Sequence, residues 1–201
     1  VIPKVADVDL SRRPADSRAF DFAEKLKQEG IQGQRAPGDA IWRYSGAEPL
    51  ADLAIESLKH FVSRQAFDIE GLGAKQIEQF YHRGWIRTSE DIFTLKTRFG
   101  PGQLQQVSKL EGWGEKSAQK LFDGIDAKRR IELHRLIFAL GIRHAGEGAA
   151  KLLANRFVTW ETFSEAMFTA IPGSAAAAAL VDIDGVGAVI AQSVVEPFQD
   201  T

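Results

Sequence analysis

A Gly-x-Gly turn followed by a helical pattern recurs along this chain, and it restricts the fold more than any other feature. Three regular copies are Gly71-Leu72-Gly73, Gly112-Trp113-Gly114 and Gly185-Val186-Gly187. An irregular copy, His144-Ala145-Gly146, lies between the second and the last. In every copy a small or apolar residue follows the final glycine by four positions, and an apolar residue follows it by seven. This spacing predicts a helix that begins at each turn and buries one face.

The spacing between the copies indicates a structural repeat. Their final glycines are separated by 41, 32 and 41 residues, which predicts a helix–hairpin–helix array. Two glycines let a turn adopt positive φ and leave its amides uncovered. Such amides at a helix N-terminus form a phosphate-binding geometry. A repeat kept for packing alone is the alternative interpretation.

Composition sets the broad class of protein. The 201 residues suffice for one or two domains with cores, and 44% apolar with 26% charged residues is typical of a globular chain. No apolar run approaches the ~20 residues needed to span a bilayer, and no signal-peptide pattern opens the chain. The lack of cysteine excludes a disulfide scaffold. We expect a cytoplasmic monomer with no membrane partner.

The net charge of −2 hides an uneven distribution. Residues 101–160 contain 10 basic and 6 acidic side chains, whereas residues 161–201 contain 6 acidic side chains and no Lys or Arg. A local basic face matters more for phosphate binding than the total charge. The second and third hairpins are therefore expected to bind most strongly. The basic run at 128–130 can equally be a solvated surface.

The remaining patterns predict a mostly α architecture with a small β part. A strand is expected at 1–10, a helix at 21–29, and a small hairpin within 31–44. Thr88 and Asp91 form a capping-box pattern. Further helices are expected at 51–63, 132–140, 146–156, 160–168 and 188–196, the last stopping at Pro197. The alanine-rich segment 171–179 either runs into a helix or stays irregular, and its role is open.

Several segments carry a family resemblance. HFVSRQAFDIEGLGAKQIEQF (60–80), LEGWGEKSA (110–118), LIFALGIRHAGEGAAKLLA (136–154) and IDGVG (183–187) closely resemble the C-terminal half of bacterial NAD-dependent DNA ligases. VIPKV (1–5) is similar to the last strand of their oligonucleotide-binding (OB) domain. The resemblance implies an OB-domain strand and linker at 1–20, a zinc-finger-like subdomain at 21–60, and a helix–hairpin–helix DNA-binding domain at 61–201.

The chain departs from this family at the zinc finger. The four cysteine positions of the family fall on Leu26, Glu29, Tyr44 and Leu50, and such residues cannot hold zinc. Either a small apolar cluster replaces the metal, or the natural gene encodes other residues there. His60, His82, His134 and His144 lack metal-ligand spacing. We therefore expect no metal site.

The sequence offers no catalytic residue. In the family a lysine of a Lys-x-Asp-Gly motif attacks NAD, and Mg²⁺ assists. Lys120-Leu121-Phe122-Asp123-Gly124 looks similar but is one residue too long and lies inside a predicted helix. No other nucleophile pairs with a base. We expect this chain to be inactive alone and to need no cofactor, while the resemblance implies NAD and Mg²⁺ for the parent enzyme.

The resemblance implies that the hairpins clamp nicked double-stranded DNA while the remaining ligase domains join the ends. Contacts to phosphates position a protein without reading bases. Trp113 can be a groove contact or a core anchor, and the equivalent Leu72 and Val186 favour the core. The alternatives are a helical protein-interaction module without DNA affinity, or the hairpin module of another DNA-repair protein. The expected DNA-binding residues are Gly71, Leu72, Gly73, Lys75, Gly112, Trp113, Gly114, Lys116, Arg143, His144, Ala145, Gly146, Gly185, Val186 and Gly187.

Overall fold

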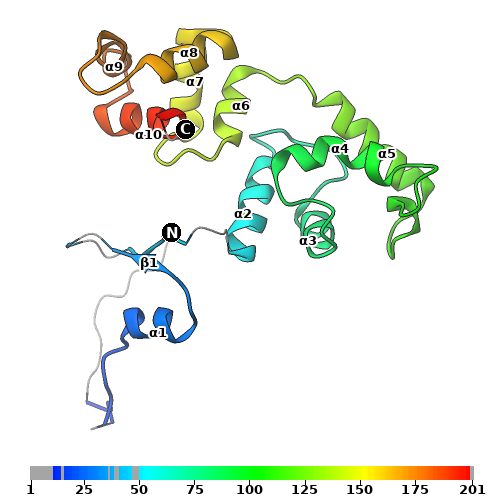
Figure 1. Cartoon of the computed structure of the whole chain (residues 1–201), viewed down its shortest axis with the longest axis horizontal. Helices are drawn as coiled ribbons and strands as arrows, with labels where there is room; N and C mark the ends of the chain where they lie inside the picture. Colours follow the sequence, from blue (N-terminus) through cyan, green and yellow to red (C-terminus); the bar gives the residue numbers. More distant parts are fainter. Residues whose placement is uncertain (1–10, 15, 36, 39–40, 47–49, 200–201) are drawn as a thin grey trace. The chain divides into compact units, whose positions relative to one another are not determined.

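The computed structural model of the chain divides into two compact units (Figure 1). They are an N-terminal unit, Val1–Pro49, and a main unit, Leu50–Thr201. The described residues are 11–14, 16–35, 37–38, 41–46 and 50–199, so the strand expected at 1–10 lies outside them. Within these ranges the chain is mostly helical, with ten α-helices, one 3₁₀ helix and a single two-stranded sheet.

The N-terminal unit contains one helix and one small sheet. Helix α1 (Phe22–Gln28) begins after Asp21, whose side chain accepts a hydrogen bond from the N–H of Glu24 at 3.0 Å. Strand β1 (Gly33–Gln34) pairs antiparallel with β2 (Arg43–Tyr44), which confirms the expected helix and hairpin. None of the described side chains in this unit is buried.

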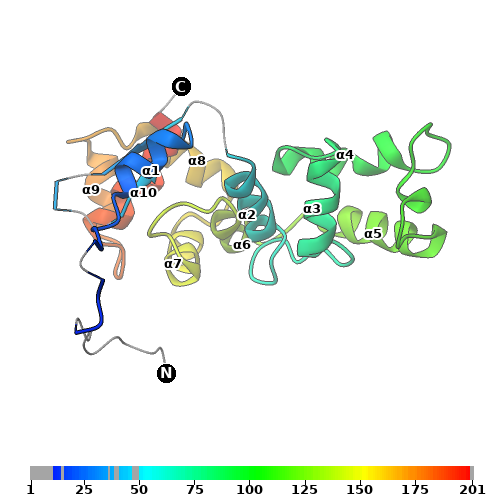
Figure 2. The same cartoon turned by 90° about the horizontal axis from the view of Figure 1, so that it is seen from below.

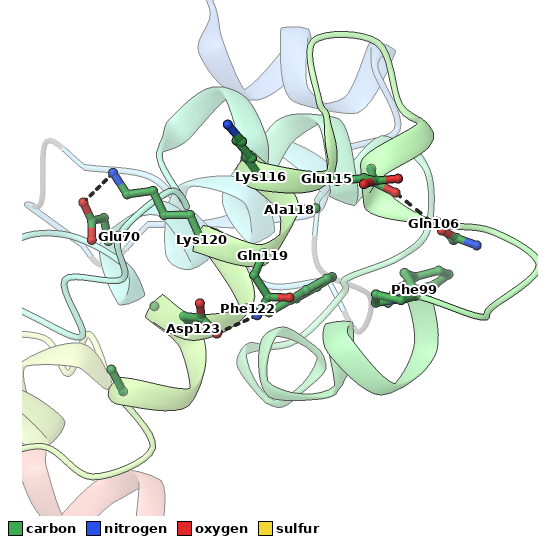
Figure 3. Close-up of a pocket in the computed structure, with 15 residues that line it drawn as sticks. Glu70, Phe99, Gln106, Glu115, Lys116, Ala118, Gln119, Lys120, Phe122 and Asp123 are labelled. Atoms are coloured by element: carbon green, nitrogen blue, oxygen red, sulfur yellow. Dashed lines mark hydrogen bonds and ion pairs between the residues drawn. The ribbon is translucent and has the colours of Figure 1, made fainter.

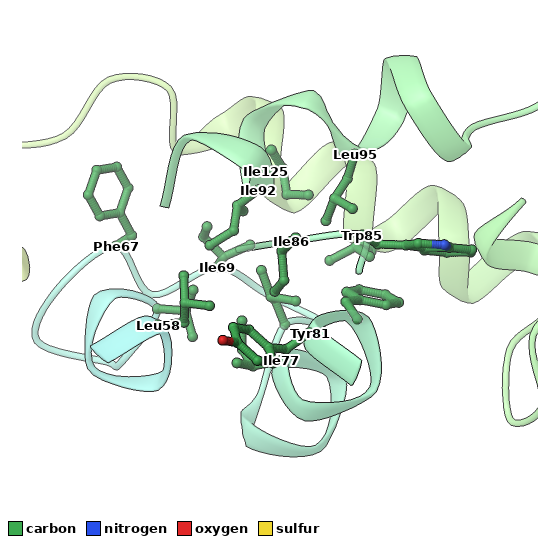
Figure 4. Packing of buried hydrophobic residues seen from close by; sticks show 14 of the residues in the cluster. Leu58, Phe67, Ile69, Ile77, Tyr81, Trp85, Ile86, Ile92, Leu95 and Ile125 are labelled. Atoms are coloured by element: carbon green, nitrogen blue, oxygen red, sulfur yellow. The ribbon is translucent and has the colours of Figure 1, made fainter. Parts of the chain in front are cut away.

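The first half of the main unit surrounds one hydrophobic cluster (Figure 4). Its core includes Ile77 and Phe80 from α3 together with Leu95 from α4, all fully buried. The expected capping box forms at the start of α4, where Asp91 accepts from the N–H of Thr88 at 3.1 Å. The elements around this cluster are α2 (Ala51–Phe61), α3 (Ala74–His82), α4 (Ser89–Phe99), the 3₁₀ helix η1 (Val107–Lys109) and α5 (Glu115–Ala127).

The second half surrounds another cluster, which includes Leu153, Phe163 and Met167. Its elements are α6 (Leu133–Ala139), α7 (Glu147–Phe157), α8 (Trp160–Thr169), α9 (Ala175–Val181) and α10 (Ala188–Gln199), drawn in yellow-green to red in Figures 1 and 2. Helix α6 serves both clusters, because Ala139 belongs to the first and Ile137 to the second.

The end of α10 and the alanine-rich segment before it compare differently with the sequence predictions. The prediction that the last helix stops at Pro197 is wrong, because α10 continues through it to Gln199. A proline near a helix end removes only one late hydrogen bond, and Phe198 packs against Phe163 with ring centroids 5.9 Å apart. The alanine-rich segment does become helical as α9, since Ser174 caps its first turn at 3.1 Å.

The proposed domain boundaries remain a prediction. The division into 1–20, 21–60 and 61–201 concerns inherited domains, whereas the units of the structure are defined by compactness. Helix α2 buries Ile55 and Leu58 in the first cluster of the main unit. In three dimensions this helix is thus part of the larger body.

Candidate nucleic-acid interface

The four repeated turns share one hydrogen-bond geometry, and we number them hairpins 1 to 4 (residues 69–73, 110–114, 142–146 and 183–187). In each, the N–H of the fourth residue donates to the carbonyl of the first. The pairs are Leu72 to Ile69 at 3.2 Å, Trp113 to Leu110 at 3.0 Å, Ala145 to Ile142 at 3.1 Å, and Val186 to Ile183 at 2.8 Å.

The residue before each donor has a positive φ, which a type II turn requires at that place. The values are 83° at Gly71, 80° at Gly112, 64° at His144 and 82° at Gly185. His144 therefore stands in the glycine position of hairpin 3, and histidine is among the residues that tolerate this conformation better than most. The irregular third copy is thus a true equivalent of the others.

The fourth residue of each hairpin, which is the middle residue of the Gly-x-Gly or His-Ala-Gly turn, points inward. Leu72, Ala145 and Val186 are buried. Trp113 is half-buried: its ring lies 5.5 Å from that of Phe80, and its Nε1 donates to Gln79 Oε1 at 2.7 Å. Trp113 therefore anchors hairpin 2 to the first cluster. Because the middle N–H groups are already used in the turns, the amides open to a ligand lie further along, at the start of each helix.

The last residue of each hairpin is a glycine, at position 73, 114, 146 or 187, and it behaves differently from the residue two places before it. None has positive φ, so in the Gly-x-Gly turns only the first glycine uses that conformation. A Cβ placed at Gly114, Gly146 or Gly187 would meet no atom within 4 Å, and at Gly73 only Gln76 Oε1 at 3.3 Å. Neither backbone conformation nor packing within the described chain demands glycine here. What glycine does provide is unobstructed access to the first amides of the helix.

Four of the other helices begin at a capping residue, whereas α2 and α6 follow Leu50 and Glu132, whose side chains make no capping bond. Asp21, Thr88, Thr159 and Ser174 cap α1, α4, α8 and α9, as expected of residues whose side chains satisfy the first N–H groups. All four helices that follow hairpins begin instead at a glycine, which has no side chain to fill that place. The N–H groups of Gly73 and Gly114 are already used, since they donate to Gln76 Oε1 at 3.2 Å and to Ser117 Oγ at 2.9 Å. The amides that follow these glycines in each helix are left for an outside acceptor.

Basic side chains without an ion-pair partner accompany three of the hairpins. Lys75, Lys116, Arg143 and His144 are exposed, and none forms an ion pair with another described residue. Two neighbouring lysines instead form ion pairs: Lys120 Nζ lies 2.8 Å from Glu70 Oε1, and Lys151 Nζ lies 2.6 Å from Glu147 Oε1. Within the basic run at 128–130, Arg129 contacts Asp126 and donates to the Phe93 carbonyl at 2.7 Å.

Hairpins 1 and 4 are pressed against neighbouring helices, whereas hairpin 2 is open. A Cβ at Gly185 would lie 2.7 Å from Leu152 Cδ1, and one at Gly71 would lie 3.5 Å from Leu121 Cα. At Gly112 nothing lies within 4 Å. Hairpin 4 also exposes Asp184 in a segment without Lys or Arg. Hairpin 2 is thus more open than hairpin 4, and it has lysines nearby that hairpin 4 lacks.

The lysine motif at 120–124 lies within α5, beside a cavity of about 860 Å³ (Figure 3). Lys120 is exposed and paired with Glu70, while Asp123 accepts from Gln119 Nε2 at 2.7 Å. Gly124 has a packing reason that the sequence did not reveal, since a Cβ there would lie 2.7 Å from the Glu70 carbonyl oxygen. A glycine inside a helix was the available signal. These residues do not fit an NAD site.

The residues at the family's zinc positions do not fit a metal either. Leu26 and Trp42 both lie close to Gly33, because a Cβ there would lie 2.9 Å from Leu26 Cδ1 and 3.5 Å from the Trp42 ring. Across the part of the chain that the structure describes, no group of three or more His, Cys, Asp or Glu residues could hold an ion. Likewise, no helix in that part is long and apolar enough to cross a membrane.

These turns and helix starts define a class of protein module. Residues 135–201, which contain hairpins 3 and 4, match the family model described as "Helix-hairpin-helix motif". The relatives are more specific. The chain is 55% identical over 196 residues to a DNA ligase of Roseobacter denitrificans, and 52% identical over 199 residues to one of Cereibacter sphaeroides. These matches cover 97% and 98% of the chain but 28% of each relative.

A DNA ligase of Dinoroseobacter shibae is 52% identical over 196 residues, which is 97% of the chain and 26% of that relative. The chain is therefore homologous to a segment of bacterial DNA ligases, and it spans little more than a quarter of their length. The resemblance identified in the sequence is confirmed at this level.

Proposed function

We propose that the four hairpins form a tandem helix–hairpin–helix array that grips double-stranded DNA through its phosphates without reading base sequence. The observation that carries this proposal is the glycine at the start of all four post-hairpin helices. Three of these glycines face open space and serve neither conformation nor packing. Open amides at a helix N-terminus suit an anionic oxygen, and the helix dipole favours the negative charge.

Side chains would complete the contact at three of the four hairpins. Lys75 and Lys116 follow the second glycine of hairpins 1 and 2 by two residues, while Arg143 and His144 lie in the turn of hairpin 3. A phosphate at the amides could meet a nearby cation in each case. Because phosphates are the same at every base pair, such contacts set position and affinity but carry no sequence information.

The homology to DNA ligases supports a larger role. In a parent NAD-dependent ligase that acts in the cytoplasm, this chain would clamp nicked DNA as a monomer while other domains join the ends in replication and repair. NAD and Mg²⁺ would then be bound outside this segment. Residues 21–60 would correspond to the family's zinc-finger subdomain, with packing of Leu26 and Trp42 in place of the metal.

Fluorescence anisotropy with two nicked duplexes of unrelated sequence tests the proposal. We expect equal affinities at each salt concentration, with log affinity falling against log salt at a slope of about −0.9 per neutralised phosphate. A single strand of the same length is the control ligand. A strong preference for one duplex, or no binding at low salt, would contradict the proposal and favour a protein-interaction module.

A further inference from the structure

A loop beside hairpin 2 exposes a leucine completely. Leu104 has 102% relative exposure, the highest of any large apolar side chain in the described chain. It lies in the segment Gly-Pro-Gly-Gln-Leu-Gln-Gln at 100–106, between α4 and η1. A leucine in this position adds nothing to the core, and water solvates it poorly.

The loop is held in place by hydrogen bonds on both sides of Leu104. Trp85 Nε1 donates to Gln105 Oε1 at 3.2 Å, and Gln106 Nε2 donates to the Gln103 carbonyl at 2.9 Å. Trp85 is itself buried and stacks on Phe99, with ring centroids 4.0 Å apart. Gln105 therefore ties the loop to Trp85, and the adjacent Leu104 is fully exposed.

The surroundings of Leu104 suit a polyanion. It shares a hollow of about 390 Å³ with Arg83, Lys109 and Leu110. Arg83 and Lys109 are exposed and form no ion pair with a described residue. No Asp or Glu occurs in the sequence between Asp91 and Glu111. Leu110 is also the first residue of hairpin 2, so this hollow borders that hairpin.

We propose that Leu104 is an apolar wedge that enters the minor groove of the duplex held by hairpin 2, with Arg83 and Lys109 on the flanking phosphates. Minor-groove proteins insert leucine and similar side chains between base steps, which partly unstacks them. This inference rests on the proposed DNA binding. It adds a contact to bases, made by an uncharged side chain, to a surface otherwise directed at phosphates.

The test compares Leu104→Ala with Ile171→Ala in the full 201-residue chain. Ile171 is 54% exposed and lies in the loop before α9, so it controls for loss of an exposed apolar side chain. Both variants should fold, because neither residue is buried. The ligand is a nicked duplex with 2-aminopurine at successive positions, whose fluorescence rises when a base unstacks.

We expect the wild-type chain and Ile171→Ala to raise the 2-aminopurine signal at one step on each bound duplex. Leu104→Ala should lose that rise and about five- to tenfold in affinity. Its salt slope should stay unchanged because leucine neutralises no phosphate, whereas Lys109→Ala should lower the slope by about 0.9.

Each other outcome has a definite meaning. If wild-type chain binds with the expected salt slope but gives no 2-aminopurine rise, or if Leu104→Ala keeps the wild-type affinity and signal, the wedge is refuted and phosphate binding stands. If wild-type chain does not bind at low salt, the proposed function fails as well. If Leu104→Ala instead abolishes self-association seen by light scattering, the leucine is a contact between copies of the chain.

Discussion

Gly114 shows how a single residue separates folding from function. Its backbone is extended, with φ −147°, and its surroundings are empty, so the fold would accept most side chains there. Gly112, two residues earlier, is at φ 80° and cannot be replaced without strain. The first glycine shapes the turn, whereas the second leaves the helix amides uncovered.

The paired variants Gly114→Val and Gly187→Val compare how much hairpins 2 and 4 contribute to DNA affinity. Both positions lack positive φ and have no neighbour within 4 Å, so the added side chain should cover amides at similar folding cost. Gly114→Val should lose about tenfold in DNA affinity, the scale of one charged hydrogen bond. Gly187→Val should lose much less, because hairpin 4 lies in a segment without Lys or Arg.

Anisotropy titrations give the affinities, and thermal melting by circular dichroism shows whether both variants fold. Equal losses, or a larger one at Gly187, would mean that backbone amides outweigh side-chain charge. The ranking of the hairpins would then be wrong.

At the scale of elements, the start of α4 depends on Asp91. Partial burial alone would raise its pKa, but N–H groups of Arg87 and Thr88 and the guanidinium of Arg98 outweigh this, and the pKa lies below its usual 3.8. A carboxylate whose pKa is lower in the folded state stabilises the fold above the unfolded value. That contribution is lost as the pH falls through the folded value.

Asp91→Ala should therefore lower the free energy of unfolding by about 1 kcal/mol at pH 7, as for a lost helix cap. The deficit should shrink below about pH 4, where protonation removes the same interactions from the wild-type chain. Urea unfolding at pH 7 and pH 3 measures both. Asp52→Ala is the control, since Asp52 is an exposed acid in the first turn of α2. A deficit independent of pH would refute the role of the charge.

Spacing and caps predicted the helices well where local signals agree with packing. The apolar residues of α3 and α5 lie where their 3.6-residue period predicts, and Thr88 with Asp91 marks the start of α4. Pro197 led to a wrong prediction because proline is a local signal for a helix end. Helix α10 continues to Gln199, and Phe198 packs against Phe163 of α8, a contact with a residue far away in sequence.

The candidate site was predictable only in outline. The repeated Gly-x-Gly pattern predicted the positions of the four hairpins, and the distribution of Lys and Arg predicted where basic side chains accompany them. The N–H groups of Leu72, Trp113, Ala145 and Val186 donate hydrogen bonds within the turns. These bonds depend on backbone angles that a glycine allows but does not fix. Next to the fully exposed Leu104, Gln105 accepts a hydrogen bond from Trp85, twenty residues away in sequence, and no local pattern signals this contact.

At the scale of the whole molecule, stability is concentrated in the main unit. None of the described side chains of the N-terminal unit is buried, whereas the main unit contains two hydrophobic clusters. Segments with few buried apolar contacts open at low free energy. Backbone amides in α1 should therefore exchange with solvent orders of magnitude faster than those in α3.

Hydrogen–deuterium exchange followed by mass spectrometry measures this difference. Repeating it with a metal chelator tests whether metal supports the N-terminal unit, and we expect the same rates. Protection of α1 equal to that of α3, or lost on chelation, would show that this unit has a source of stability beyond the packing of Leu26 and Trp42.

Each hydrophobic cluster is closed by two hairpins and a helix between them: hairpins 1 and 2 with α4, and hairpins 3 and 4 with α8. A third hairpin added alone would leave an apolar face exposed to water. We therefore expect such an array to lengthen in steps of two hairpins. The equal 41-residue spacing within both pairs is what duplication of one ancestral pair would leave behind.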